Sequence, residues 1–165
     1  MMSGLFSFRA IRFAGLVAAA LSMGACARNN PEENATMANA SAATPGSQQD
    51  FVVNVGDRVF FEVDSSELTQ QSIAVLERQA QWLRAYPQYA FMIEGHADER
   101  GTREYNIALG ARRAQAVRNY LASRGVQAHR MRTISYGKER PVAVCNDISC
   151  WSQNRRSVTV LNASS

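Results

Sequence analysis

The sequence has little excess charge of either sign. Its 18 lysines and arginines face 14 aspartates and glutamates, a formal net charge of +4. Arg9 and Arg12 lie in a segment that we interpret below as a removed signal peptide, which leaves 16 basic residues against 14 acidic ones. Nucleic-acid-binding domains carry a strong basic excess, so no polyanion-binding surface is expected.

Catalytic motifs are also lacking. The chain has two histidines, His96 and His129, and neither lies in a His-Glu-x-x-His motif. No sequence around a serine or cysteine is typical of a catalytic nucleophile. One alternative stays open, a metal-dependent hydrolase in which His96, Asp98 and Glu99 bind zinc or act as an acid and base. We expect no enzyme activity and no cofactor.

The first 25 residues contain no acidic residue and no apolar run long enough to span a bilayer. Arg9 and Arg12 precede an apolar stretch from Phe13 to Met23, about half of the ~20 residues that a membrane-spanning helix needs. This order is typical of a secretory signal peptide. The sequence Met23-Gly-Ala-Cys26 then resembles the lipobox of bacterial lipoproteins, which implies cleavage before Cys26 and lipidation of its thiol and amine.

Such a lipid anchor is effectively permanent, because each buried methylene contributes about 0.8 kcal/mol. Ala27, rather than an aspartate, follows the cysteine, and the resemblance to Gram-negative lipoproteins implies export to the outer membrane, facing the periplasm. The alternative is an ordinary secretory signal followed by an incidental cysteine.

Residues 27–50 lack aromatic side chains and are rich in Asn, Ala, Ser, Thr, Pro and Gln. Such a segment buries too little apolar surface to fold. We therefore predict three parts: a signal peptide at 1–25, a lipidated cysteine with a disordered tether at 26–50, and one folded domain at 51–165.

The folded part is predicted to be an α/β sandwich, a mixed β-sheet with helices packed on one face. Phe51, Val53 and Val55 alternate and predict a first strand, and residues 58–63 predict a second. Apolar side chains at three- and four-residue steps predict helices over 69–86 and 103–124. Further strands are predicted at 89–94, 132–136 and 157–161.

The most informative stretch runs from Gly95 to Asn106 and reads Gly-His-Ala-Asp-Glu-Arg-Gly-Thr-Arg-Glu-Tyr-Asn. Arg-Arg-Ala follows at 112–114, Ser-Tyr-Gly-Lys at 135–138 and Asn-Arg-Arg at 154–156. In this order the segments resemble the peptidoglycan-associated lipoproteins and, more broadly, the C-terminal domain of outer membrane protein A. The resemblance covers about residues 50–161.

This resemblance implies a protein that binds peptidoglycan stem peptides without chemistry. The family positions matching Asp98 and Arg113 clamp diaminopimelate, so Arg113 would bind a ligand carboxylate and Asp98 would bind its ammonium or order the loop. Asp64 would be a further pocket carboxylate, and Asn106 and Leu109 would line the pocket. The alternatives are an internal Asp98–Arg113 salt bridge and a turn or helix-capping role for Asp64.

The resemblance also implies a protein partner. The family docks a TolB-like periplasmic propeller, and possibly other Tol proteins, on a surface that overlaps the wall-binding face, in a system for envelope integrity and cell division. The candidate contact residues here are Glu99, Arg100, Thr102, Tyr105, Tyr136 and Lys138. An ordinary exposed polar loop is the alternative.

Once Cys26 carries lipid, Cys145 and Cys150 remain as an even pair with four residues between them. In an oxidising periplasm such a pair favours a disulfide. Two reduced cysteines remain an alternative, as does a two-thiolate metal site, although that site lacks obvious third and fourth ligands.

Replacing Cys26 by Ser tests the lipid anchor. Without the thiol that accepts the lipid, the Cys26→Ser variant should lose its hold on the membrane and be extracted without detergent. Immunoblots of washed membranes and soluble fractions measure this partition. Continued retention in the membrane would contradict the anchor.

Overall fold

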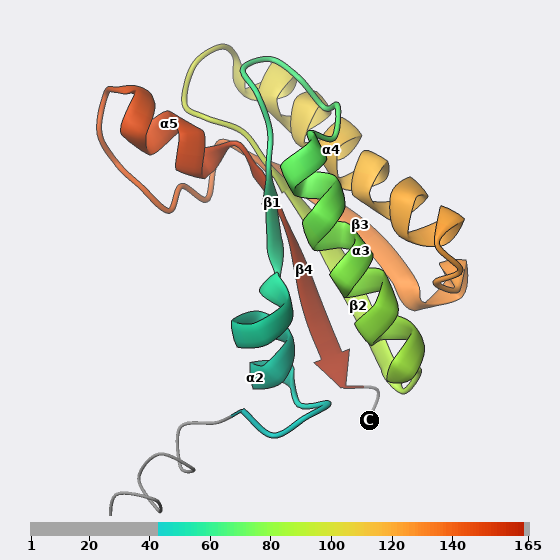
Figure 1. The fold of residues 1–165 in the computed structure, drawn as a ribbon. Coiled ribbons are helices and arrows are strands. Elements are labelled where there is room, and N and C mark those ends of the chain that lie inside the picture. Colours follow the sequence, from blue (N-terminus) through green and yellow to red (C-terminus); the bar gives the residue numbers. More distant parts are fainter. Residues whose placement is uncertain (1–42, 164–165) are drawn as a thin grey trace, which may run out of the picture. The chain divides into compact units, whose positions relative to one another are not determined.

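The computed structural model describes residues 43–163. The predicted signal peptide, Cys26 and most of the tether lie outside these residues and stay predictions. Within the described part, no helix is long and apolar enough to cross a membrane. The elements follow in this order (Figure 1): α2 Gln48–Asp50, the π-helical turn η1 Phe51–Gly56, β1 Arg58–Phe60, α3 Gln70–Ala85, β2 Tyr89–His96, α4 Arg103–Ser123, the 3-10 turn η2 Ala128–Arg130, β3 Met131–Gly137, α5 Ile148–Asn154 and β4 Arg156–Ala163.

The strands form one mixed sheet in the order β1-β4-β2-β3. β2 and β3 run parallel, and β4 lies between β1 and β2, antiparallel to both. α3 and α4 cover one face of this sheet (Figure 1). Burying each large apolar side chain between these layers contributes about 1.5–3 kcal/mol. The predicted sandwich is confirmed, with a core that includes Leu76, Ala80, Leu83, Phe91, Ile93, Ala114, Val117, Leu121 and Met131.

The two long helices begin and end close to their predicted limits. Thr69 caps α3 by accepting a hydrogen bond from the Ser72 amide, and Thr102 caps α4 in the same way through Tyr105. Past the end of α4, Gly125 takes a φ of +85°, which suits glycine at a helix terminus. The cap at Thr102 fixes where α4 begins.

The first predicted strand is wrong, because residues 51–56 form the helical turn η1. Phe51 is buried against Trp82 of α3, with ring centroids 4.9 Å apart. Asp50 accepts hydrogen bonds from Trp82 Nε1 and from the Gly46 amide, both at 2.8 Å. Alternation indicates a strand only when alternate side chains share a buried face, yet Val53 is 65% exposed. Contacts with α3 therefore outweigh the strand preference of the valines.

The domain also starts earlier, and its second strand is shorter, than the sequence predicts. The compact unit begins at Ala43, before the expected boundary at Phe51, and the Gly46 carbonyl accepts a hydrogen bond from the Tyr89 hydroxyl. Residues 43–50 thus pack on the domain rather than belonging to the tether. β1 ends at Phe60, so residues 61–63 are not part of the strand.

β2 and α4 approach each other at two glycines. A Cβ on Gly110 would lie 2.8 Å from the Gly95 carbonyl oxygen and would also meet Ser135 Oγ, and a Cβ on Gly95 would overlap the Gly110 carbonyl. This approach brings the next turn of α4, with Arg113, within hydrogen-bonding distance of the end of β2 at His96.

Gly110→Ala tests this close packing. Alanine inside a helix normally stabilises by roughly 0.5–1 kcal/mol relative to glycine, but overpacking against a backbone costs about 1–3 kcal/mol. We therefore expect urea denaturation to give a lower free energy of unfolding. Gln115→Ala, at an exposed position of the same helix, should change it by less than about 0.5 kcal/mol. A Gly110→Ala variant as stable as the parent would contradict the packing.

Candidate functional site

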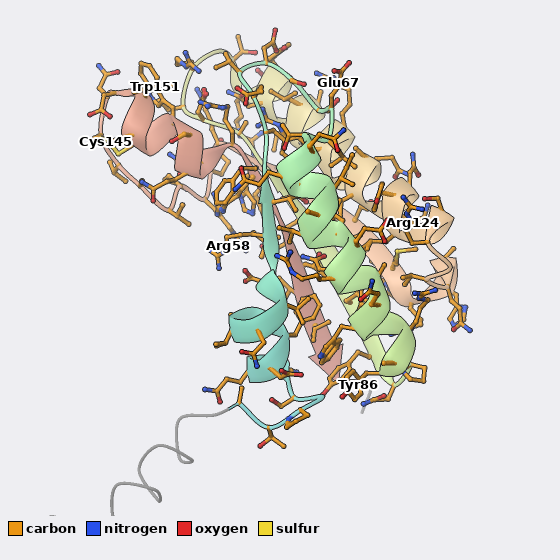
Figure 2. All side chains as sticks on the ribbon, in the orientation of Figure 1. Arg58, Glu67, Tyr86, Arg124, Cys145 and Trp151 are labelled. Atoms are coloured by element: carbon orange, nitrogen blue, oxygen red, sulfur yellow. A yellow bond between two sulfur atoms is a disulfide. The ribbon has the colours of Figure 1, made fainter. Side chains whose placement is uncertain are left out.

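A cavity of about 240 Å³ lies where β2 ends and α4 begins. This end of the domain carries Glu67 and Trp151, and Tyr86 lies at the other end (Figure 2). The cavity contains all five residues predicted to contact a ligand, although that contact stays a prediction. Its lining consists of Val63, Asp64, Asp98, Arg100, Gly101, Tyr105, Asn106, Leu109 and Arg113.

The most deeply buried lining residue is Arg113 of α4, which is 0% exposed. Its Nε donates to the Ser65 carbonyl at 2.8 Å, its Nη1 to the His96 carbonyl at 2.8 Å and its Nη2 to the Glu62 carbonyl at 3.1 Å. Burial, and next the charge of Arg155, lower the pKa of Arg113 to about 10, so the guanidinium is still charged at neutral pH. These bonds join α4 to the end of β2 and to the segment after β1.

Asp98 pairs with two other arginines. Arg100 donates from Nη2 to Oδ2 at 2.6 Å and from both Nε and its backbone amide to Oδ1 at 3.2 Å, and Arg155 Nη1 lies 3.5 Å from Oδ2. Burial alone would raise the pKa of Asp98, but the hydrogen bonds and charges of these arginines outweigh it and lower that pKa. The ion pairs of the described residues do not include the Asp98–Arg113 bridge that the sequence left open.

Asp64 is the exposed carboxylate of the cavity. It has a φ of 54°, a left-handed conformation in which aspartate is found more often than most residues. The Tyr105 hydroxyl donates a hydrogen bond to its Oδ1, and this bond raises the pKa of Tyr105. Asp64 is therefore a turn residue whose carboxylate also faces the mouth of the cavity.

Side chains from two elements fix the loop between β2 and α4. Asn106 Nδ2 donates to the Arg100 carbonyl at 2.8 Å. Lys138 Nζ, which follows β3, donates to the Glu99 and Gly101 carbonyls at 3.1 and 2.7 Å. The backbone of the loop is therefore held in one arrangement by the protein itself.

The residues expected to contact a protein partner divide into two groups. Tyr136 and Lys138 are half-buried, and both make contacts within the domain: Tyr136 lies under the Arg140 guanidinium, and Lys138 bonds to the loop. The exposed members are Glu99, Arg100, Thr102 and Tyr105, and of these Arg100 and Tyr105 line the cavity.

Known proteins are similar to this chain in sequence and in fold. The OmpA family model matches residues 60–155. Over 144 residues the chain is 67% identical to the peptidoglycan-associated lipoprotein of Rhizobium meliloti strain 1021, which covers 86% of this chain and 82% of the relative. The Haemophilus influenzae protein of that name is 40% identical over 153 residues, which is 91% of this chain and 95% of that protein. The chain belongs to the peptidoglycan-associated lipoprotein family, within the OmpA family.

Solved structures agree with this family assignment. The crystal structure of the peptidoglycan-associated lipoprotein from Burkholderia pseudomallei is 45% identical, with a TM-score of 0.63 over 64% of this chain and 90% of that one. The C-terminal domain of Helicobacter pylori MotB is 23% identical with a TM-score of 0.62, and this likeness shows the fold alone. The resemblance seen in the sequence is confirmed.

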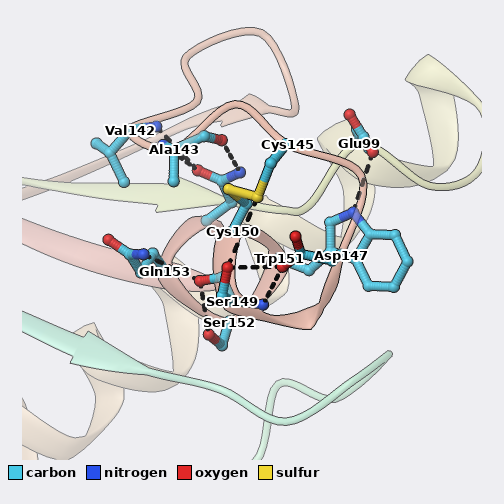
Figure 3. Close-up of a disulfide and its surroundings, with 11 residues drawn as sticks. Glu99, Val142, Ala143, Cys145, Asp147, Ser149, Cys150, Trp151, Ser152 and Gln153 are labelled. Atoms are coloured by element: carbon cyan, nitrogen blue, oxygen red, sulfur yellow. Dashed lines mark hydrogen bonds between the residues drawn. A yellow bond between two sulfur atoms is a disulfide. The ribbon is translucent and has the colours of Figure 1, made fainter.

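The disulfide predicted between Cys145 and Cys150 is present (Figure 3). It closes the turn that leads into α5, a helix that the sequence analysis did not predict. Asn154, at the end of α5, accepts hydrogen bonds from the amides of Val142 and Ala143 at 2.8 and 3.2 Å. The disulfide and this amide side chain hold α5 and the preceding loop together.

Two residues beside the cavity, Arg155 and Trp151, were not predicted from the sequence to belong to the site. Arg155 is buried, pairs with Asp98 and donates from Nε to the Phe61 carbonyl at 3.0 Å. Trp151 donates from Nε1 to Glu99 Oε1 at 3.0 Å (Figure 3). The Asn-Arg-Arg motif pointed to Arg155 without giving its partner, and no pattern in the sequence pointed to Trp151.

His96 is buried in a setting that disfavours its charged form. It is 1% exposed, and neither ring nitrogen has a hydrogen-bond partner within residues 43–163. Its Nε2 lies 3.5 Å from Glu94 Oε2 without hydrogen-bond geometry. Burial, followed by the charges of Arg156 and Arg140, lowers the pKa of His96 from 6.5 to about 4.

This burial predicts a pH dependence of stability. Between about pH 6.5 and pH 4 the unfolded chain binds a proton at His96 that the folded domain does not, so stability falls as pH falls through this window. From about pH 7.5 to pH 5 the loss attributable to His96 is about 2 kcal/mol. In urea titrations His96→Gln should remove this loss, whereas the exposed His129→Gln should keep it. An equal loss in both variants would contradict the neutral, buried state of His96.

Proposed function

We propose that this lipoprotein is anchored in the outer membrane and binds peptidoglycan stem peptides non-covalently through diaminopimelate, linking membrane and cell wall. The distal carbon of diaminopimelate carries both an ammonium and a carboxylate. One observation carries the proposal: a single cavity is lined by two carboxylates, Asp64 and Asp98, and two guanidinium groups, Arg100 and Arg113. Such a site suits a zwitterion better than a simple anion or cation.

The energies of a few charge-assisted hydrogen bonds are sufficient for micromolar binding of the stem peptide. Charge-assisted hydrogen bonds contribute about 1.5–3 kcal/mol each, and micromolar binding corresponds to about 8 kcal/mol. Two or three such bonds, with apolar contact to Val63 and Leu109, reach this range. The ordering cost is small because Arg113 and Lys138 already hold the backbone around the cavity.

The ligand roles follow from exposure. The family resemblance gives Asp98 two possible roles, binding the ligand ammonium or ordering the loop. Its contacts with Arg100 and Arg155 favour the second role. Asp64 is exposed and is the carboxylate that meets the ligand ammonium. Asn106 and Leu109 support and line the cavity beside it.

A metal-dependent hydrolase is not favoured. In residues 43–163 no three His, Cys, Asp or Glu side chains are grouped so that they could hold a metal ion. The relatives are named as wall-associated lipoproteins, and the proposed role is structural rather than catalytic.

A protein partner belongs to the same proposal. Arg100 and Tyr105 line the cavity, and Glu99 and Thr102 are exposed in the loop between β2 and α4. A TolB-like propeller that docks there therefore competes with the wall, in a Tol system that serves envelope integrity and cell division. Excess wall fragments should release the propeller in a pull-down. Simultaneous binding of both would contradict a shared surface.

Asp64→Asn tests the wall-binding site. Arg113→Ala is less informative, since it removes the buried hydrogen bonds that Arg113 donates to three backbone carbonyls. The Asp64→Asn variant should bind a diaminopimelate stem peptide about tenfold or more weakly by calorimetry, because an amide cannot pair with the ammonium. Glu67→Gln, an exposed carboxylate three residues on, should leave binding unchanged. Undiminished affinity of Asp64→Asn would count against the proposed ligand contact.

A further inference from the structure

A second cavity, of about 400 Å³, lies along the edge strand β1. Among the described strands β1 is an outermost one, and it pairs with β4 (Figure 1). Residues 58–62 line the cavity from the strand side, and residues of α3 and α5 line it from the other sides. We call this cavity the edge groove. It shares no lining residue with the cavity at the end of β2.

The pairing of β1 with β4 fixes which backbone groups of β1 face away from the sheet. The backbone of β4 and its flanking residues bonds to the Asp57 carbonyl at 2.7 Å and to the Phe61 amide at 3.0 Å. In an antiparallel pair the residues that exchange such bonds alternate along each strand. The amides and carbonyls of Arg58 and Phe60 therefore point toward the free edge of β1.

Three of these four backbone groups are available to a ligand. The Phe60 carbonyl accepts a hydrogen bond from Ser72 Oγ at 2.8 Å. Within residues 43–163 the Arg58 amide, the Arg58 carbonyl and the Phe60 amide have no hydrogen-bond partner. Unpaired donors and acceptors at a sheet edge are a template for the addition of another strand.

The side chains of the edge groove suit a peptide in an extended conformation. Val59 and Phe61 are buried and Val75 is half-buried, so the groove offers apolar surface to a side chain. Gln71 of α3 and Gln153 of α5 add exposed amide groups. Side-chain amides both donate and accept hydrogen bonds, as a peptide main chain does.

The charged residues of the edge groove leave one carboxylate without a counter-ion. Arg58 pairs with Asp57 at 2.8 Å, and Arg155 lies 3.5 Å from Asp98. Glu62 is exposed and forms no ion pair with any residue that the structure describes. Charge complementarity therefore favours a peptide with a lysine or arginine beside Glu62.

We propose that the edge groove binds an extended, basic peptide segment of another protein, which adds a strand to β1. The main chain of this segment bonds to the Arg58 amide and carbonyl and to the Phe60 amide. One apolar side chain packs against Val59, and a basic side chain pairs with Glu62. In such strand addition the main chain supplies affinity, and alternate side chains select the partner.

The test uses a capped pentapeptide, acetyl-Thr-Val-Lys-Val-Thr-amide, as the probe. Hydrogen–deuterium exchange with mass spectrometry follows fragments around residues 57–61 of the full chain in detergent. Without the probe the amides of Arg58 and Phe60 should exchange fast, because they are unpaired. Excess probe should protect both amides, with half of the effect reached at about 1 mM or below.

Two N-methylated versions of the probe identify main-chain pairing. Alternate amides of an added strand bond to β1, and the amides between them point away. Of two probes methylated at the lysine and at the valine before it, one should bind about tenfold or more weakly and the other should change by less than about threefold. Equal binding of these two probes would contradict strand addition.

Variants of the protein test the same contacts. Phe60→Pro removes an amide that bonds to nothing in the domain, and proline is tolerated in edge strands. It should bind the probe about tenfold or more weakly, whereas Phe60→Ala, which keeps the amide, should lose less. Glu62→Gln should weaken binding about threefold, and Glu67→Gln, outside the groove, should not. Thermal unfolding confirms that each variant is folded.

Three results would overturn the inference. The first is the absence of protection with about 10 mM probe. The second is undiminished binding by Phe60→Pro. The third is protection of the Arg58 and Phe60 amides without any probe, since the groove would then be filled already. Protection that persists on dilution would assign it to residues 27–42, and protection lost on dilution to a second copy of the chain.

Discussion

The buried guanidinium of Arg113 is the contact on which the site depends. Burying an arginine is costly unless its N–H groups find acceptors, and here the carbonyls of Glu62, Ser65 and His96 supply them. Those carbonyls come from the segment after β1 and from the end of β2. The close approach of Gly95 and Gly110 gives the side chain its reach. One residue of α4 thereby fixes where both neighbouring backbones lie.

Around this contact the charges form two layers. Arg113, Arg155 and Asp98 are buried and bonded within the protein, so they add rigidity to the cavity. Asp64 and Arg100 lie at the exposed mouth, where water can be exchanged for ligand groups at little cost. A site that separates support from recognition in this way can be rigid before the ligand arrives, which favours affinity.

The sequence predicted what depends on local pattern and missed what depends on distant contacts. Strong helical periodicity placed α3 and α4 within a residue or two. Alternation at Phe51 predicted a strand, but the aromatic contact with Trp82 and the Asp50 hydrogen bond, both distant in sequence, select a helical turn. α5 was missed because its seven residues are too few to show a period, and its position depends on a disulfide and on Asn154.

The candidate site shows the same division. The family motif brought Asp64, Asp98, Asn106, Leu109 and Arg113 to one cavity. It did not show which of them are exposed, because exposure depends on how α4 packs on β2. The partners of Asp98 are Arg100, in the loop after β2, and Arg155, the residue before β4. The spacing of these residues in the sequence does not predict that they pair.

An NMR titration of the protein with a diaminopimelate stem tetrapeptide tests most directly whether the cavity beside Arg113 binds the wall peptide. Chemical-shift changes should concentrate at Asp64, at residues 98–106 and at Arg100 Nε. The domain has a second cavity of about 400 Å³, lined by residues of β1, α3 and α5, and the signals of its lining residues should not change. Shifts centred on that second cavity, or no shifts at all, would contradict binding in the cavity beside Arg113.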